Sequence, residues 1–218
     1  MIQKIPLCPY NSHKVVVELG IGNGCLLKKL VEMDKKNNGN ATTKIGSLYI
    51  GIELDSSKCD KARSILQSFT NVTVLHGSFE TIMHDFSDGS IDEIISVFPD
   101  PDFIDREKQQ KWEKFYRVVQ RKLSRQGRLR LVTELIDDLL QPVPEEAHKV
   151  WVRWLIETFQ DLGFFHLQTV EGSPLGYESE CLERFKADPE RIRIATFDFV
   201  KSQSPLDFIS QEIRFCLT

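Results

Sequence analysis

Short apolar runs alternate with segments of helical periodicity through the first 135 residues, and this alternation limits the fold more than any other feature of the sequence. Each strand-like run is followed by a stretch whose apolar residues recur at helical spacing. Such a rhythm is typical of a parallel sheet with helices on both faces, because neighbouring parallel strands need a crossover between them. The predicted strands span 14–19, 46–54, 71–77, 90–98 and 127–135. The chain is therefore predicted to be an α/β protein with a mostly parallel, doubly wound sheet.

The remaining segments complete this outline. A long amphipathic helix is expected over 105–123, and residues 145–163 predict a helix that ends at Gly163. Two late strand patterns, 164–172 and 191–201, are expected to pair antiparallel at one edge of the sheet, and the polar stretch 35–47 is expected to be a loop. We expect one domain over residues 1–201, followed by a C-terminal tail over 202–218.

Composition limits the classes of protein that the chain can belong to. It has 218 residues, 41% of them apolar, and a mean hydropathy of -0.26, which suits a globular domain with a real core. The sequence contains no run of about 18 apolar residues, so no membrane span is predicted. No signal peptide is recognised either, and a cytoplasmic protein, or a nuclear one in a eukaryote, is expected. Five scattered cysteines predict reduced thiols and no metal site. A net charge of -4 argues against gripping nucleic acid by bulk electrostatics.

A glycine-rich segment lies directly after the first predicted strand. In "VVVELGIGNG", Glu18 precedes three glycines at alternate positions, Gly20, Gly22 and Gly24, at the point where the first helix opens. Glycines there let the backbone turn tightly and approach a ligand closely. A dinucleotide is one candidate ligand, although it prefers the spacing GxGxxG. The acid can also be no more than a capping or solvated carboxylate.

The spacing of this loop, with an acid two residues before the first glycine, resembles the S-adenosylmethionine loop of class I methyltransferases, which have a Rossmann-like fold. The resemblance implies that Glu18 anchors the loop or reaches the amino group of the cofactor's methionine. Glu53, at the end of the second strand in "GIELD", can accept hydrogen bonds from ribose hydroxyls. Ser78, after the third strand, lies where such enzymes often hold the adenine amino group, which a serine can do only weakly.

The fourth predicted strand ends in "VFPDPD", with Asp100 held between two prolines. The carboxyl ends of parallel strands form the edge of the sheet at which ligands bind in doubly wound folds. Proline fixes its own φ, and Pro101 disfavours the helical region for Asp100, so the direction of the carboxylate is restricted. Holding a group in place beforehand lowers the entropy cost of aligning reactants. A plain turn at the exit of the strand is the alternative reading.

Taken together, the loop, the "GIE" segment, "DGSID" and a fourth strand ending "FPDP" resemble the tRNA (guanine-N7)-methyltransferase family over roughly residues 14–200. The resemblance implies S-adenosyl-L-methionine as cofactor and Asp100 as the key active-site aspartate. It places Glu134 near the guanine and puts Ser179 and Glu180 in the family's late substrate-binding segment.

The chain departs from that family on the substrate side. Asp102 stands where the family has tryptophan after "FPDP", Ile104 replaces a lysine, and Leu182 falls where a glutamate is usual. Much of the basic start of the following helix is lost. With a tRNA substrate, the resemblance therefore implies an accessory protein subunit that helps to bind RNA, as a β-propeller does in eukaryotic members.

The chemistry of guanine N7 fits such a site. N7 carries a lone pair and no proton, so its methylation needs alignment with the sulfonium methyl and stabilisation of positive charge, and no general base. A fixed carboxylate such as that of Asp100 can supply both by accepting hydrogen bonds from the base. The expected function is methyl transfer to N7 of a guanine in tRNA. The alternatives are a methyltransferase for another substrate and a non-catalytic scaffold subunit with the same fold.

Overall fold

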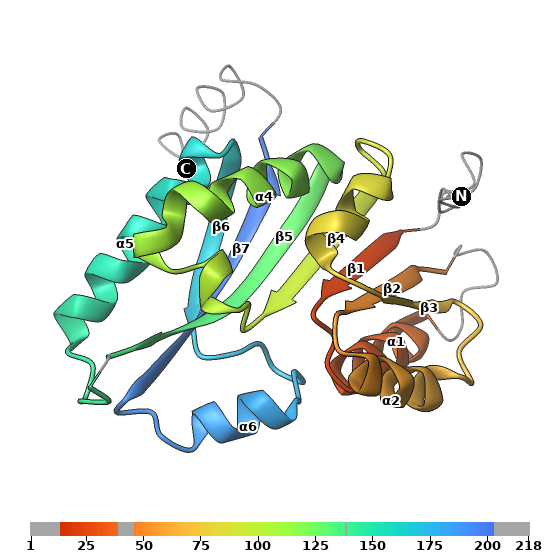
Figure 1. The fold of residues 1–218 in the computed structure, drawn as a ribbon, viewed down its shortest axis with the longest axis horizontal. Coiled ribbons are helices and arrows are strands. Elements are labelled where there is room, and N and C mark those ends of the chain that lie inside the picture. The colour runs from red at the N-terminus through yellow and green to blue at the C-terminus, as the bar shows by residue number, and fades with distance from the viewer. Residues whose placement is uncertain (1–13, 39–45, 138, 203–218) are drawn as a thin grey trace.

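A computed structural model describes residues 14–38, 46–137 and 139–202, which form a seven-stranded sheet flanked by helices (Figure 1). The strand order is β3-β2-β1-β4-β5-β7-β6. Strands β1 to β5 pair in parallel, and β7 is antiparallel to both of its neighbours. The predicted α/β class and the antiparallel C-terminal strand are confirmed. The structure refines the position of that strand, because β7 lies between β5 and β6 and leaves β6 at the edge.

The five predicted parallel strands are all present, with ends that shift by a few residues. The strands are β1 (Val15–Leu19), β2 (Leu48–Glu53), β3 (Val72–His76), β4 (Ile91–Val97), β5 (Leu123–Ile136), β6 (Phe164–Glu171) and β7 (Ile192–Lys201). The largest difference is at β5, which begins four residues before the predicted 127. Its first residue pairs with Ile91, and a register shift follows. A Cβ on Gly127 would come within 2.9 Å of Leu123 Cβ, so only glycine fits this irregular start.

Helices connect the strands on both faces of the sheet. They are α1 (Cys25–Asn38), α2 (Ser56–Leu66), α3 (Phe79–Ile82), α4 (Gln109–Lys122), α5 (Glu145–Asp161) and α6 (Glu180–Lys186). Helix α1 extends four residues into the stretch predicted as a loop, and the rest of that loop, 39–45, lies outside the described residues. The expected end at Gly163 is confirmed, since α5 stops two residues earlier and Gly163 has φ +87°.

Helix α4 starts later than predicted. The expected helix began at 105, but Asp105 instead caps a 3₁₀ turn over Arg106–Lys108 by accepting a 2.9 Å hydrogen bond from Glu107 N. The carbonyl of Asp105 accepts from Trp112 Nε1 at 2.7 Å, which ties the turn to the buried face of α4. The hydrogen bond from Glu107 N to the Asp105 side chain favours a 3₁₀ turn over α-helix at residues 106–108, so α4 begins only at Gln109.

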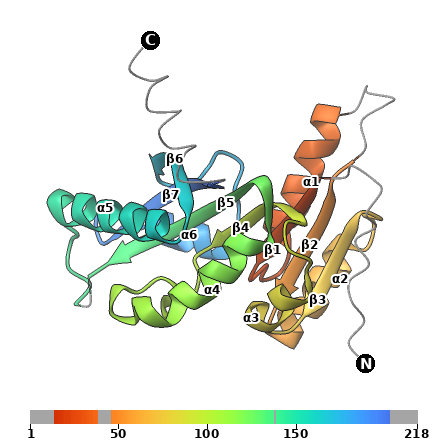
Figure 2. The same cartoon turned by 90° about the horizontal axis from the view of Figure 1, so that it is seen from above.

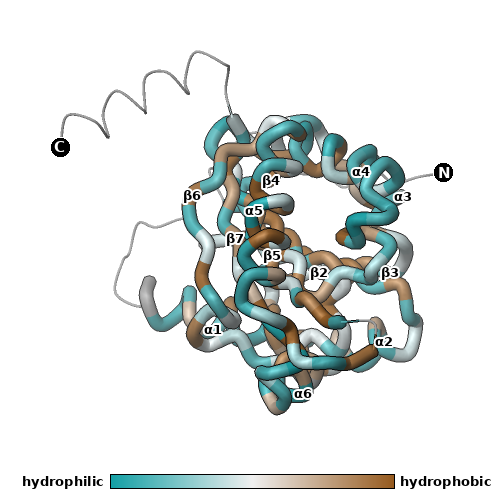
Figure 3. The backbone as a smooth tube through the Cα atoms, turned by 90° about the vertical axis from the view of Figure 1, so that its left-hand side faces the viewer, coloured by the Kyte–Doolittle hydropathy of each residue, from teal (hydrophilic) through white to brown (hydrophobic). Residues whose placement is uncertain are grey.

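Two apolar layers enclose the sheet because successive strand residues point to opposite faces. Val15 and Val17 lie in the larger cluster with α4 and α5, whereas Val16 lies in the smaller one with α1, α2 and α6. Helices α4 and α5 lie side by side over the first face (Figure 2). In Figure 3, α4 is largely hydrophilic in colour while β5 has hydrophobic stretches, as expected for an amphipathic helix on a buried strand.

Some predictions concern parts of the chain beyond this description. The predicted domain of 1–201 and the tail of 202–218 include residues 1–13 and 203–218, which lie outside the described residues, so those boundaries remain predictions. Among the helices that are described, none is long and apolar enough to cross a membrane.

Candidate active site

The glycine segment forms an open loop at the carboxyl end of β1. Gly20, Gly22 and Gly24 have φ of +70°, +56° and +82°, a region that disfavours side chains. A Cβ on Gly20 or Gly22 would meet nothing within 4 Å, so the backbone faces open space where a ligand can approach. A Cβ on Gly24 would lie 3.0 Å from Ala62 Cβ. Gly24 therefore allows α2 to pack against the start of α1.

Glu53 holds this loop in place. Its Oε2 accepts a 2.7 Å hydrogen bond from Gly22 N, and its Oε1 accepts one of 2.9 Å from Asp55 N. The side chain is buried, and Asp55 in turn caps α2 by accepting a hydrogen bond from Lys58 N. Each carboxylate oxygen has a second lone pair, so these contacts leave Glu53 able to accept hydrogen bonds from a ligand. Its predicted role with ribose hydroxyls remains a prediction.

Glu18 is a buried carboxyl without a hydrogen-bond partner for Oε2 among the described residues. Burial raises its pKa to about 8, and the nearby charge of Glu53 adds to the shift. Since Glu53 and not Glu18 bonds the loop amide, Glu18 remains available to a hydrogen-bond donor or cation. Its predicted contact with the amino group of the cofactor's methionine remains a prediction.

Ser78 lies just after β3 and has a local structural role. Its Oγ accepts a 3.2 Å hydrogen bond from Glu80 N and caps α3. The carbonyl of Glu53 accepts from Gly77 N at 2.8 Å, so the end of β3 lies beside the end of β2. The structure thus brings Ser78 to the same edge as Glu53, and its predicted contact with adenine remains a prediction.

The "FPDP" segment follows the end of β4, and its first residue, Phe98, has a strained backbone conformation. Phe98 has φ +49°, which is rare for a bulky side chain, and its N donates a 2.8 Å hydrogen bond to Val132 O on β5. Asp100 is exposed, with φ -51° and ψ 142°, and its Oδ1 caps the turn Pro101–Phe103 by accepting from Asp102 N. The prediction that Pro101 keeps Asp100 out of the helical region is confirmed.

Glu134 is the second carboxyl expected on the substrate side. It lies near the end of β5, two residues beyond Val132, which accepts the hydrogen bond from Phe98 N. Burial raises its pKa to about 7, and its Oε2 has no partner in the part of the chain that the structure describes. Glu134 and Glu18 therefore share a feature, an unpaired buried oxygen, that ordinary structural carboxylates lack.

The late segment reaches the site from a distant part of the sequence. Lys29 on α1 forms a 3.2 Å ion pair with Glu178, and Ser179 caps α6 by accepting from Leu182 N. On the other side, the rings of Phe185 and Phe98 meet edge to face with centroids 4.7 Å apart. Glu180 is the first residue of α6. These contacts place the late segment beside both the glycine-loop helix and the "FPDP" exit.

The departures from the family pattern have structural counterparts. Ile104 and Leu182 are buried in the two apolar clusters, so each contributes to the core in place of a charged residue. Asp102 forms ion pairs with Lys108 at 2.6 Å and with Lys111 at 2.9 Å. These hydrogen bonds lower the pKa of Asp102 to about 2.

Sequence reasoning missed two of these features. It treated the basic start of α4 as largely lost, whereas two lysines remain and are neutralised by Asp102. Lys108 and Lys111 follow Asp102 by six and nine residues, and no local sequence pattern predicts these pairings. It also gave no role to Phe98, whose positive φ no local pattern predicts.

Solved structures share this architecture. A Haemonchus contortus phosphoethanolamine N-methyltransferase 2 in complex with S-adenosyl-L-methionine has a TM-score of 0.58 and 13% identity, over 90% of this chain and 50% of that one. An S-adenosylmethionine-dependent methyltransferase from Mesorhizobium loti has a TM-score of 0.57 and 14% identity, over 85% of this chain and 90% of that one. With the strand order and the glycine loop, these likenesses define the fold as the Rossmann-like class I methyltransferase fold.

Sequence comparison identifies the family. Residues 12–152 match the family described as "Putative methyltransferase", and the chain belongs to this family. A tRNA (guanine-N(7)-)-methyltransferase of Xanthomonas axonopodis pv. citri is 28% identical over 178 residues, 77% of this chain and 64% of that protein. One from Porphyromonas gingivalis is 27% identical over 127 residues, which are 57% of this chain and 48% of that protein. The predicted resemblance is confirmed as a divergent one, and the chain spans less than two thirds of these relatives' length.

Proposed function

We propose that this protein transfers a methyl group from S-adenosyl-L-methionine to N7 of a guanine in tRNA. The observation that carries the proposal is the exit of β4, where Asp100 is fixed outside the helical region at the edge that also holds the glycine loop. Membership of the methyltransferase family and the named relatives support the reaction and the substrate.

The cofactor half of the proposal rests on the loop and its two acids. The open backbone at Gly20 and Gly22 would lie against the methionine part of the cofactor, and Glu18 would accept from its ammonium group. Glu53 would accept from the ribose, and Ser78 would lie near the adenine. The bound cofactor supplies an electrophilic methyl group on a sulfonium.

The substrate half rests on acceptors for a donor-rich base. Guanine presents N1–H and an amino group on one edge, and Asp100 would accept hydrogen bonds from these donors and so aim N7 at the methyl. As N7 is alkylated the ring becomes positive, and a fixed carboxylate stabilises that charge more in the transition state than in the ground state. Glu134 would be the second acceptor, and Ser179 and Glu180 belong to the segment that the family resemblance assigns to substrate binding.

The test is a methylation assay with purified protein, tRNA and labelled S-adenosylmethionine, read by mass spectrometry of nucleosides. We expect N7-methylguanosine from the native protein and a loss of 100-fold or more in Asp100→Asn, about 2.7 kcal/mol of transition-state stabilisation. Asp161→Asn, at an exposed position at the end of α5, is the matched control. Protein that binds the cofactor but forms no N7-methylguanosine would disprove the proposal.

Asp102 favours a second candidate on the substrate side. With Lys108 and Lys111 paired to Asp102, the surface beside Asp100 offers less free positive charge to an RNA phosphate. Either an accessory subunit supplies RNA affinity, or the enzyme methylates a different substrate. A competition experiment separates these cases. Excess tRNA slows methylation of another acceptor only if tRNA binds at the same site, so an unchanged rate favours the different substrate.

A further inference from the structure

The outer face of α4 carries a ridge of positive charge. The helix has five basic residues and one acidic residue, in a chain whose net charge is -4. Lys114, Arg117 and Arg121 are exposed and recur at intervals of three and four, so they lie on one helical face, here called the basic ridge. The acid, Glu113, is half-buried and accepts a 2.8 Å hydrogen bond from Gln109 Nε2. The ridge therefore contains no negative charge of its own.

The cations at the two ends of α4 have partners in the protein. At the start of the helix, Lys111 pairs with Asp102 at 2.9 Å. At its end, Asp88 pairs with Arg121 at 3.2 Å and with Lys122 at 2.9 Å. Arg121 and Lys122 also lie in the last turn, where the helix dipole favours positive charge. These contacts account for the charges at the ends of the helix and not for those in its middle.

Lys114 and Arg117, in the middle of α4, form no ion pair within residues 14–38, 46–137 and 139–202. They are three residues apart, about 4.5 Å along the helix axis, and like charges at such a spacing repel each other. An anion that contacts both side chains relieves this repulsion. The middle of α4 therefore fits a ligand that carries closely spaced negative charges.

The basic ridge continues from the candidate active site. Asp100 caps the turn that precedes α4, and Lys111, which contacts Asp102 from that turn, lies three residues before Lys114. A guanine held at Asp100 thus brings the strand that contains it close to the start of α4. The sugar-phosphate backbone of a nucleic acid carries negative charge at short, regular intervals, which matches the ridge in sign and spacing.

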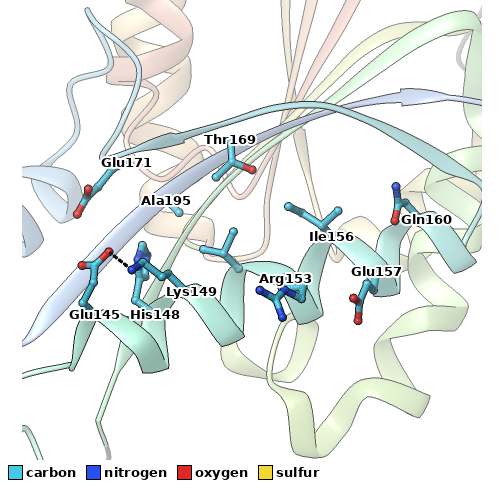
Figure 4. Close-up of a pocket in the computed structure, with 11 residues that line it drawn as sticks. Glu145, His148, Lys149, Arg153, Ile156, Glu157, Gln160, Thr169, Glu171 and Ala195 are labelled. Carbon is cyan, nitrogen blue, oxygen red and sulfur yellow. Dashed lines mark ion pairs between the residues drawn. The ribbon is translucent and has the colours of Figure 1, made fainter. Parts of the chain in front are cut away.

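Helix α5, which packs beside α4, has a different distribution of charge. In the groove that it forms with β6 and β7, Glu145 and Glu157 alternate with Lys149 and Arg153 (Figure 4). Lys149 and Glu145 also form an ion pair. Because acids and bases are mixed there, the groove attracts a polyanion less than the ridge does. Residues of this groove therefore supply matched controls.

We propose that Lys114 and Arg117 bind the phosphate backbone of the substrate RNA along the outer face of α4. The inference rests on the proposed RNA substrate and adds where its backbone lies. Contacts of this kind supply affinity and salt dependence and carry no information about the base, which is recognised at the end of the sheet. The two residues act in substrate binding and not in methyl transfer itself.

Removal of the two charges tests the contact. Lys114→Gln combined with Arg117→Gln should weaken tRNA binding at low salt about 10-fold or more and lower the slope of log K against log salt by about one to two. Fluorescence anisotropy with labelled tRNA measures both. In the methylation assay, KM for tRNA should rise and kcat should not change. Lys149→Gln combined with Arg153→Gln removes the same charge from α5 and is the matched control.

Addition of charge tests the contact in the other direction. Gln110 is exposed and lies four residues before Lys114 on the same helical face. Gln110→Lys should strengthen tRNA binding about 3-fold and steepen the salt slope by about one. Gln160→Lys in the α5 groove is the control and should change neither. A damaged fold cannot produce such a gain.

The outcomes separate this inference from the proposed function. Native tRNA affinity and salt slope in the Lys114 and Arg117 double variant would overturn the inference. An equal loss in the α5 control would also overturn it, because net charge alone would then explain the effect. If the native protein forms no N7-methylguanosine but the double variant still loses tRNA affinity, the proposed reaction fails and the RNA-binding surface stands. If the double variant methylates tRNA with the native KM, the reaction stands and the inference fails.

Discussion

Glu53 Oε2 accepts a 2.7 Å hydrogen bond from Gly22 N, and this contact ties the end of β2 to the loop after β1. Glu53→Ala removes the acceptor for both Gly22 N and Asp55 N and frees the loop to rearrange. We expect the affinity for S-adenosylmethionine to fall about 10- to 100-fold, as for loss of one charge-assisted hydrogen bond at about 1.5–3 kcal/mol. Titration calorimetry measures this, with Glu146→Ala on α5 as an exposed control. Unchanged affinity in Glu53→Ala would show that the loop needs no such anchor.

Glu18 makes the stability of the fold depend on pH. Its pKa is about 8 in the folded protein against an ordinary value of 4.5, so the folded state binds more protons than the unfolded state between these pH values. The free energy of unfolding must then fall as pH rises from about 5 to 8, by at most about 1.4 kcal/mol per pH unit from this group. Glu18→Gln, which stays neutral, should remove this part of the slope. Urea unfolding at pH 5, 6.5 and 8 measures it, and equal slopes in both proteins would contradict the prediction.

The sequence predicted most of the sheet because its signals are local. The run of valines before Glu18 and the glycines after it specify a strand and a turn without help from the rest of the chain. The start of β5 was missed because its pairing with Ile91 is long-range, and only the close approach at Gly127 reveals it.

The candidate site was predictable where it is built from chain-adjacent residues. The left-handed glycines and the extended Asp100 follow from glycine and proline chemistry alone. The pairing of Phe98 with Phe185 joins residues 87 positions apart, and local patterns carry no information about it. The two ion pairs of Asp102 depend on how the 3₁₀ turn before α4 presents Lys108, which helix periodicity alone misplaces.

Two glycines of the same loop should respond differently to alanine. Gly24→Ala puts a Cβ 3.0 Å from Ala62 Cβ at a positive φ, so both a clash and backbone strain oppose it. Gly20→Ala meets only the strain, since nothing lies within 4 Å. We expect Gly24→Ala to lower the free energy of unfolding by about 2–4 kcal/mol and Gly20→Ala by about 1 kcal/mol. Urea denaturation at pH 7 compares them, and equal losses would mean that α2 moves away at little cost.

Phe98 stores backbone strain at the exit of β4. Its φ of +49° suits glycine better than any residue with a Cβ. Phe98→Ala and Phe98→Gly both lose the ring contact with Phe185, but only glycine relieves the strain. We therefore expect Phe98→Gly to be more stable than Phe98→Ala by about 1 kcal/mol, although glycine is the more flexible residue when unfolded. Thermal and urea unfolding of the two variants measure the difference, and a more stable alanine variant would mean that the exit is not strained.

Asp102 neutralises positive charge at the start of α4. Its carboxylate forms ion pairs with Lys108 at 2.6 Å and with Lys111 at 2.9 Å, and both lysines are exposed. Asp102→Asn keeps the size of the side chain and removes the charge, so the two lysines become available to phosphate. We expect tRNA affinity at low salt to rise about 3- to 10-fold, and the slope of log K against log salt to steepen by about one to two counterions.

Filter binding or fluorescence anisotropy between 50 and 200 mM salt measures both quantities. Asp60→Asn, an exposed aspartate on α2 that pairs with Arg63, is the matched control and should change neither. Lys108→Ala combined with Asp102→Asn should return the affinity toward the native value, since the gain depends on the freed cation. An Asp102→Asn protein with native affinity and slope would show that RNA does not contact this turn, and would favour the other-substrate candidate.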